Sequence, residues 1–389
     1  MPAIGTPQIS RLTWSLEVGG LDVDPIQGAV TWDETSIPSL QIDVVIPYSD
    51  ATWTAVDPQA DARAQLSALH EFTESDPLAT ITAEGHTTLA DLSAAWSGLT
   101  LADVSALYGT PITPDGTLYP HDRLAFDVGV RTARRTRSDG QEFVTLTLAC
   151  DEARALDVLA TERLELASTT IRGLINEALG YIDATLEPDL DNPDSSSPFH
   201  TDGPLPDGAN LWEVGVSVWD VIKAAADSGG YIIRCDHQSK WRLVDPGFTA
   251  TPSAGEPVNT SYVDAAQISH DRSREDDWYD TVVIEYRWRD ESGVEQQQTD
   301  VATIAVGTPR RVYHEVRSAP YGGSAAAAIL ERVSNRGNHV EGSQAVNLWA
   351  RPGSVLNWEV DPGELDAGIV SRVRWSITDD VMALQGRDF

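Results

Sequence analysis

The stretch LAFDVGVRTARRTRSDGQEFVTLTLAC, residues 124–150, has the pattern of two β-strands joined by a turn and points to a β fold. Apolar and polar residues alternate on both sides of Asp139-Gly140, a pair that is typical of a tight hairpin turn. The apolar positions are Leu124, Phe126, Val128 and Val130 in the first arm and Val144, Leu146 and Leu148 in the second. The stretch therefore predicts a long β-hairpin with one buried face.

The same alternation occurs upstream and near the end of the chain. Residues 11–18 and 40–46 alternate strictly and predict two more strands of a first β region. Residues 281–288 alternate in the same way, and further strands are expected at 344–350, 355–360, 368–378 and 380–387. Two β regions are thus predicted, one at each end of the chain.

The centre of the chain has a different pattern. Apolar residues from Ile171 to Ile182 recur at helical spacing behind Thr169 or Thr170, which predicts a capped amphipathic helix. Ser217 with Asp220 predicts the start of a second helix that runs to Gly229-Gly230. The segments YIIRCD and KWRLVD follow as a predicted hairpin, and five prolines between 187 and 208 predict an exposed loop.

A tandem repeat of twelve residues lies between the strands of the first β region. Residues 88–99 read TLADLSAAWSGL and residues 100–111 read TLADVSALYGTP. In each copy a threonine, Thr88 or Thr100, precedes an acid by three residues, as at a capped helix start. The repeat predicts two short helices, with Trp96 in the core, that form an insertion over about 77–118.

These patterns predict a mainly β protein with α+β parts. Two β-barrel tube-type domains are expected to flank an α+β domain. The expected boundaries are 1–160 for the first barrel with its helical insertion, 161–255 for the α+β domain and 256–389 for the second β-rich domain.

Composition restricts the function. The net charge of −33 argues against nucleic-acid binding as the main function, because phosphate backbones repel an acidic chain. Cys150 and Cys235 are too few for a disulfide framework or a four-ligand zinc site, and we expect both to be buried. No stretch approaches the ~20 apolar residues of a membrane span, and the first residues lack the pattern of a signal peptide. We expect a soluble protein that is made in a cytoplasm.

Chemical motifs give no support for catalysis. The sequence contains no nucleophile elbow, zinc helix or phosphate-binding loop, so we expect no catalytic residues, no cofactor and no metal. The acids of residues 189–194 are spaced like a calcium loop but lack its glycine. His121-Asp122 and His270-Asp271 are neighbours in sequence only. The tryptophans 96, 212, 219 and 241 could stack on sugars, although packing in the core is the favoured interpretation.

Several segments together resemble one family, the minor tail proteins of siphophages that infect actinobacteria. The resemblance rests on residues 124–157, the repeat at 88–111, and VTWDETSIPSLQIDVVIPYSDATWTAVDP at 30–58. The ending RPGSVLNWEVDPGELDAGIVSRVRWSITDDVMALQGRDF is also similar to theirs, and residues 217–246 and 276–288 look like segments of tail hub proteins.

The resemblance implies a structural hub protein at a phage tail tip, similar to the baseplate hub of contractile tails. It implies a homotrimer that docks on the distal tail or tail tube ring and contacts the tape measure protein and tip or receptor-binding proteins. Genomic DNA would pass without specific binding, the chain would not insert into a membrane, and assembly would occur in the host cytoplasm. Because the first hundred residues carry 14 acids and two cations, we further predict that acids of the first barrel line a negative channel. The equally weighted alternative is that these acids only solvate the outer surface, because the polar positions of a barrel can face either way. The acids named for this role are Asp22, Asp24, Asp33 and Asp43.

Two other classes remain open. Residues 80–126 are reminiscent of a LysM module, which would make the protein a peptidoglycan- or glycan-binding tail protein. A tail-associated cell-wall hydrolase is the third class.

Overall fold

A computed structural model describes most of the chain in thirteen segments. These are residues 10–72, 119–168, 170–187, 210–228, 231–244, 258–261, 267–272, 278–289, 293–308, 311–317, 325–334, 338–359 and 365–387. The chain divides into two compact units, one of residues 16–66 and 126–389 and one of residues 1–15 and 67–125. The helical repeat at 77–118 lies outside the described residues, as do Trp96 and the acids of the loop at 189–194.

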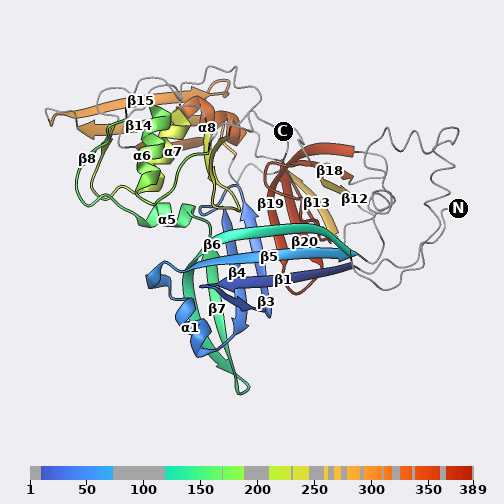
Figure 1. The fold of residues 1–389 in the computed structure, drawn as a ribbon. Coiled ribbons are helices and arrows are strands. Elements are labelled where there is room, and N and C mark those ends of the chain that lie inside the picture. The colour runs from blue at the N-terminus through green and yellow to red at the C-terminus, as the bar shows by residue number, and fades with distance from the viewer. Residues whose placement is uncertain are drawn as a thin grey trace, which may run out of the picture. The chain divides into compact units, whose positions relative to one another are not determined.

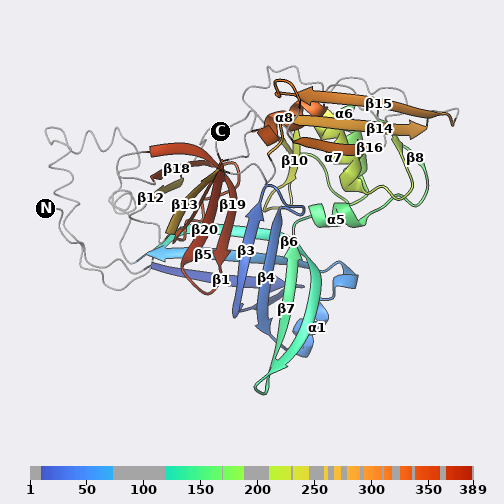
Figure 2. The same cartoon turned by 180° about the vertical axis from the view of Figure 1, so that it is seen from behind.

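The dominant element is one large sheet of 13 strands. Its main path runs β13-β17-β20-β19-β3-β4-β7-β6-β5-β1-β2, and β12 and β18 join it beside β19. Figures 1 and 2 show β20, β19, β3, β4 and β7 as successive strands of this path. The bounds are β1 Ser10–Val18, β2 Leu21–Val23, β3 Gln27–Asp33, β4 Leu40–Pro47, β5 Arg63–Phe72, β6 Tyr119–Ser138, β7 Gln141–Ala149, β12 Val258–Ser261, β13 Gln267–Arg272, β17 Asn338–Ala345, β18 Val355–Glu359, β19 Leu365–Ser376 and β20 Val381–Arg387. The mainly β class predicted from the sequence is confirmed.

The predicted hairpin of residues 124–150 is formed by β6 and β7. Asp139 and Gly140 have φ angles of 52° and 83°, so both occupy the left-handed region that a tight hairpin turn requires. The alternating apolar residues of β7 and of the neighbouring β4 are fully buried on one face. They are Leu40, Ile42, Val44, Ile46, Val144, Leu146 and Leu148.

The two β regions are joined by direct strand pairing. Strand β19, near the end of the chain, is antiparallel to β3, and Trp375 pairs with Val30 while Val373 pairs with Trp32. The side chains of Val30, Val373 and Trp375 are fully buried. A single hydrogen-bonded layer therefore continues from the first β region into the last.

The centre of the chain forms small α+β elements. Helix α5 spans Glu152–Asp157, α6 spans Ile171–Gly180 and α7 spans Val218–Ser228. The Thr170 side chain accepts a hydrogen bond from the Gly173 amide, and Ser217 and Asp220 bond reciprocally, so both predicted helix starts are confirmed. Short pairs β8 Leu164–Glu165 with β9 Leu211–Trp212, and β10 Ile232–Cys235 with β11 Trp241–Val244, complete this part.

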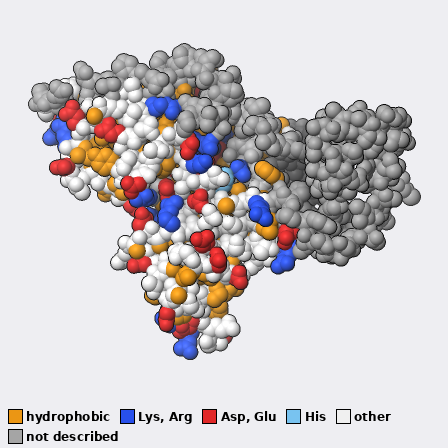
Figure 3. Space-filling view, in the orientation of Figure 1, with side chains coloured by type: hydrophobic (Ala, Val, Ile, Leu, Met, Phe, Trp, Pro, Cys, Tyr) orange, Lys and Arg blue, Asp and Glu red, His pale blue; other side chains and the backbone are white. Residues whose placement is uncertain are grey.

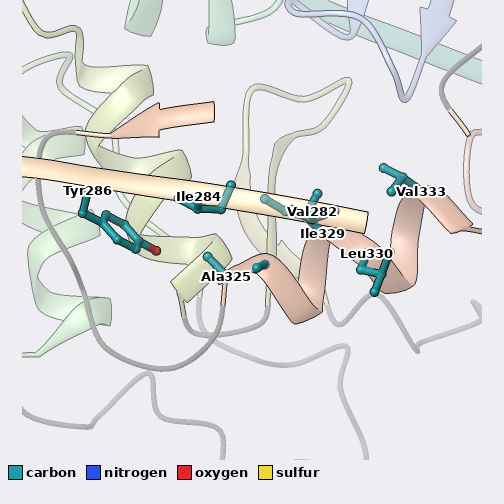
Figure 4. Packing of buried hydrophobic residues seen from close by; sticks show 8 residues of the cluster. Val282, Ile284, Tyr286, Ala325, Ile329, Leu330 and Val333 are labelled. Atoms are coloured by element: carbon teal, nitrogen blue, oxygen red, sulfur yellow. The ribbon is translucent and has the colours of Figure 1, made fainter. Parts of the chain in front are cut away.

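A second, three-stranded sheet lies later in the chain. Strand β14, Thr281–Arg289, is central between β15, Glu295–Thr303, and β16, Val312–Arg317. One face packs on helix α8, Ala325–Ser334, and Figure 4 shows Val282, Ile284 and Tyr286 of the strand beside labelled residues of that helix. The cluster is Val282, Ile284, Tyr286, Ala325, Ala326, Ile329, Leu330 and Val333.

The prediction of a strand at 344–350 is wrong for most of these residues. Strand β17 ends at Ala345, and the side chain of Asn347 accepts a hydrogen bond from the Trp349 amide at 2.8 Å, which turns the chain. Val346, Leu348 and Ala350 are nevertheless buried, so the alternation reflects burial without strand pairing. Among the described residues no helix is both long and apolar enough to span a bilayer.

Candidate functional site

One candidate surface among the described residues is the face of the large sheet opposite its buried apolar side chains. Residues on this face alternate with the buried apolar residues of the same strands, and successive strands align them into rows. One row crosses five strands and consists of Ser343, Ala383, Arg374, Thr31 and Gln41. A neighbouring row consists of Ser269, Glu341, Gln385, Arg372 and Asp33. We call these two rows, together with Asp43 and Thr147, the polar face.

The polar face carries charges of both signs. Asp33 lies 3.7 Å from the guanidinium of Arg372, and Asp43 accepts a hydrogen bond of 3.0 Å from the hydroxyl of Thr147. Glu341 accepts one of 2.9 Å from the amide of Gln385. The carboxylates of the face thus have local partners, and the surface carries side chains of both charges instead of a block of one charge.

The four acids predicted to line a channel fall into two places. Asp33 and Asp43 lie on the polar face, where the arginines 372 and 374 accompany them. Asp22 lies in β2 and Asp24 directly after it, and both are exposed. The negative channel wall stays a prediction.

A shallow cavity of about 320 Å³ lies on this face over β17, β19 and β20. Ser269, Glu341, Ser343, Arg372, Arg374 and Gln385 contribute to its lining. Hydrogen-bonding groups of this kind can hold a polar side chain or backbone segment of a partner, and none of them is arranged as a nucleophile beside a base.

Behind the polar face, one buried carboxylate connects three distant parts of the sequence. The side chain of Glu34, just after β3, is 2% exposed. It accepts hydrogen bonds from Arg234 of β10 at 3.1 Å and from Arg387 of β20 at 2.6 Å. A buried carboxylate requires such partners. The contacts of Glu34 with Arg234 and Arg387 therefore hold β10 and β20 against the end of β3.

A second buried ion pair connects helix α7 with the three-stranded sheet. Arg317 donates to Asp227 at 2.6 Å, and their side chains are 4% and 2% exposed. Arg317 also bonds Glu315 at 3.0 Å, and Lys223 lies 3.6 Å from the same carboxylate. Burial opposes ionisation of Glu315, but Lys223 and Arg317 outweigh it and lower the pKa of that carboxyl.

Residues of both ionic clusters line one cavity of about 280 Å³. Its wall also contains Glu152, whose carboxylate accepts hydrogen bonds from the backbone amides of Ser39 at 2.6 Å and Cys235 at 3.0 Å. Burial raises the pKa of Glu152, although these two amides oppose the shift. The carboxylate therefore connects the residue before β4 with the end of β10.

The remaining titratable groups of this region suit a structural role. Cys150 and Cys235 are both buried, as predicted, and burial raises the pKa of the Cys235 thiol, which makes it a poor nucleophile. Burial also lowers the pKa of His237 to about 4. Within the described ranges no group of three His, Cys, Asp or Glu residues could hold a metal ion.

The tryptophans considered for sugar stacking are core residues where the structure describes them. Trp212, Trp219 and Trp241 are 1%, 6% and 0% exposed, so the packing interpretation is confirmed. The side chains of His121 and His270 and most of the LysM-like segment lie outside the described residues. Sequence reasoning missed the polar face because its rows depend on pairing between β3 and β19, which are more than 300 residues apart.

Comparison with known proteins gives a result only at the level of structure. No family model matches the sequence, and no curated protein matches it. The crystal structure of a tail protein from Neisseria meningitidis is similar over 97% of this chain and 96% of its own, with a TM-score of 0.56 and 12% identity. This chain has the fold of a phage tail protein.

A second solved structure supports the same assignment of the fold. The 43 kDa tail protein of prophage MuSo2 from Shewanella oneidensis matches with a TM-score of 0.54 and 10% identity. The match covers 96% of this chain and 98% of that one. The likeness to phage tail proteins therefore extends over nearly the full length of both chains, as the sequence resemblance implied.

Proposed function

We propose that this protein is a structural hub protein of a phage tail tip. It closes or extends the tail tube and connects the tube to tip and host-recognition proteins. The proposal is supported by the tail-protein fold and by the resemblance of segments such as residues 124–157 to siphophage minor tail proteins.

The single observation that carries the proposal is the pairing of β3 with β19. This pairing makes one sheet from two β regions, with an apolar buried face and a polar exposed face. A wall of this kind is suited to a tube, because its three acids, Asp33, Asp43 and Glu341, outnumber Arg372 and Arg374 and leave a small excess of the charge that repels a DNA backbone. In this function DNA passes without specific binding.

The partners follow from the proposed place in the tail. Three copies assemble as a homotrimer, and six similar surfaces on three chains allow docking on a sixfold distal tail or tail tube ring. The tape measure protein and the tip or receptor-binding proteins are the other partners. The protein is assembled in the host cytoplasm and resides at the virion tail tip.

The proposed role is not enzymatic. Buried carboxylates at Glu34, Glu152 and Asp227 are engaged in structural hydrogen bonds and ion pairs, and the Cys235 thiol is held in its neutral form by burial. These contacts support a scaffold, since catalytic acids and bases need access to a substrate.

The test uses a phage that carries this gene with an amber codon at Trp14. In a non-suppressing host the proposed function predicts particles without a complete tail tip, seen by negative-stain microscopy. Expression of the wild-type chain in trans should restore tips and infectivity. Complete tails that contain no copy of this chain would overturn the proposal, and so would intact tips that only fail to degrade or bind the cell wall.

A further inference from the structure

Strand β15 forms one edge of the three-stranded sheet, and Figures 1 and 2 show it as the outer strand beside β14. The Ile304 amide donates to the carbonyl of Asp280, which lies directly opposite it in the ladder, at 2.9 Å. Residues of even number in β15 therefore bond to β14, because hydrogen-bonded and non-bonded pairs alternate along an antiparallel ladder. The backbone N–H and C=O groups of Gln297, Thr299 and Val301 point the other way, toward the outside of the sheet.

These outward groups are not used within the chain. Gln297, Thr299 and Val301 are exposed, and among the described residues their outward backbone groups have no hydrogen-bond partner. We call residues 297–301 the open edge. Lysine, proline and β-bulges are features that keep an edge strand from pairing with another chain. Strand β15 contains no lysine or proline, and its nine residues pair with β14 without a bulge.

Other edge strands of the described chain are shorter. Strands β2, β12, β13 and β16 have three, four, six and six residues. In β16 the side chain of Arg317 is also committed, because it forms the buried ion pair with Asp227 of α7. The nine-residue strand with the open edge is thus the better site for an added strand.

The side chains along β15 define what fits beside it. Glu295 at its start is 80% exposed, although it bonds to Arg289, and Figure 3 shows acidic and basic side chains at the end where β14 and β15 join in Figure 1. At the other end Val301, Ile304 and Val306 are exposed apolar residues. Opposite charges and β-branched residues stabilise neighbouring strands when they lie side by side. An antiparallel neighbour that fits begins with valine, isoleucine or threonine and ends with lysine or arginine.

We propose that the open edge accepts an extended segment of another tail protein, which adds to the sheet as a fourth, antiparallel strand. This inference rests on the proposed tail function and names one interface of it. Pairing of β15 with β15 of a second copy has twofold symmetry, so it cannot connect the copies of a threefold ring. The short edge strands of a second copy offer fewer backbone groups to the open edge than it presents.

Amide hydrogen exchange, resolved by residue with mass spectrometry, tests the proposal on the full chain and on the same chain in purified tails. In the isolated chain the amides of Gln297, Thr299 and Val301 should exchange fast. Those of Gln298 and Asp300 bond to β14 and should exchange slowly in both samples, which makes them the internal control. In tails the three outward amides should slow by about tenfold or more, because an added strand takes up their hydrogen bonds.

A variant tests whether the contact needs the backbone. Thr299→Pro removes an outward N–H and no hydrogen bond to β14, and proline is tolerated at such edge positions. Tails assembled with T299P should contain about tenfold less of one other virion protein, since the added strand loses its central hydrogen bond. Thr299→Ala keeps the N–H and should give tails of normal composition. Far-UV circular dichroism of T299P checks that the sheet is intact.

The outcomes separate this interface from the proposed function. Outward amides that still exchange fast in tails overturn the interface alone. Slow outward exchange in the isolated chain also overturns it: protection at every concentration assigns the edge to the chain itself, and protection that grows with concentration assigns it to a second copy. Equal losses in T299P and T299A contradict a backbone contact. Purified tails without this chain overturn the proposed function and the interface together.

Discussion

Two junctions hold the parts of this chain together, and they use different physics. At the first junction β3 pairs with β19 through backbone hydrogen bonds, with Val30 and Trp375 buried beneath. At the second, buried ion pairs connect the α+β centre to both β regions, with Glu34 bonded to Arg234 and Arg387. The strand pairing is made by backbone groups and by apolar residues that alternate onto the buried face, whereas the ionic contacts depend on pairs of charged side chains.

The difference determines how each junction responds to its surroundings. Apolar burial at Trp375 involves no titratable group and no ion pair, so pH and the screening of charges by salt have little effect on it. The ionic junction requires charged partners, and removal of one partner leaves the other charge buried. We expect the sheet to hold over conditions in which the α+β centre loosens.

The largest effect is expected at the paired strands. Trp375 is fully buried, donates from its indole nitrogen to the Asn347 carbonyl at 3.1 Å and lies 5.8 Å from the ring of Phe126. Trp375→Ala should destabilise the protein by about 3 to 5 kcal/mol, as truncation of a buried aromatic does. Denaturant unfolding followed by far-UV circular dichroism measures it. The control, Trp53→Ala, removes a side chain that is 39% exposed and should change stability far less; equal losses in the two variants would contradict the description of this core.

At the ionic junction, replacing one partner of the Asp227–Arg317 pair should destabilise the protein more than replacing both partners. Asp227→Leu leaves the guanidinium of Arg317 buried beside Glu315 alone and should cost about 3 kcal/mol. The double variant D227L/R317M removes both buried charges and should be clearly more stable than the single variant, because Lys223 can still pair with Glu315. Thermal unfolding of the two variants measures the difference. A double variant that is less stable than D227L would contradict the conclusion that the main role of Arg317 is to compensate the buried charge of Asp227.

Acidification should weaken the contact between the large sheet and the β10–β11 hairpin, which contains His237 in its turn. His237 lies 5.5 Å from the ring of Trp32, and its pKa is lowered to about 4 from an ordinary value of 6.5 by burial and by Arg351. The unfolded chain therefore binds this proton more readily, so stability is present above pH 6.5 and is lost as the pH falls toward 4. At about 1.4 kcal/mol per pKa unit the loss approaches 3 kcal/mol. Denaturant titrations between pH 7 and pH 4 should show a flatter dependence for His237→Phe than for the wild-type chain, and an unchanged slope would refute this source of the pH dependence.

The smallest effect is expected on the polar face. Arg372 is 45% exposed at its side chain and lies 3.7 Å from Asp33. Arg372→Ala should change the free energy of unfolding by less than about 1 kcal/mol, since solvent screens exposed ion pairs. The same unfolding experiment at low and high salt measures it. A decrease in the free energy of unfolding as large as that expected for Asp227→Leu would show that the polar face contributes to stability and is not only a surface available for contacts.

Local patterns in the sequence predicted most individual elements. The Asp139-Gly140 turn, the Thr170 and Ser217 helix starts and the alternation in β4 follow from neighbouring residues, and the structure contains all of them. The exception, residues 346–350, shows that alternation reports burial and that an Asn side chain can turn a buried segment.

The long-range features could not be predicted from one sequence. Nothing near Glu34 indicates that its partners lie 200 and 353 residues away. Asp227 and Arg317 are residue types that normally occur on surfaces. Only their burial in the structure distinguishes this ion pair from the exposed ones, and the sequence does not show that burial. The polar face likewise appears only when β3 and β19 are paired.

A threefold-averaged reconstruction of the virion tail tip tests the central claim most directly. A hub of the proposed kind has three copies of this chain in a ring, with the row that contains Thr31, Gln41 and Arg374 turned toward the channel. Density for the chain outside the tip, or a ring in which this row is buried against another protein, would contradict the account.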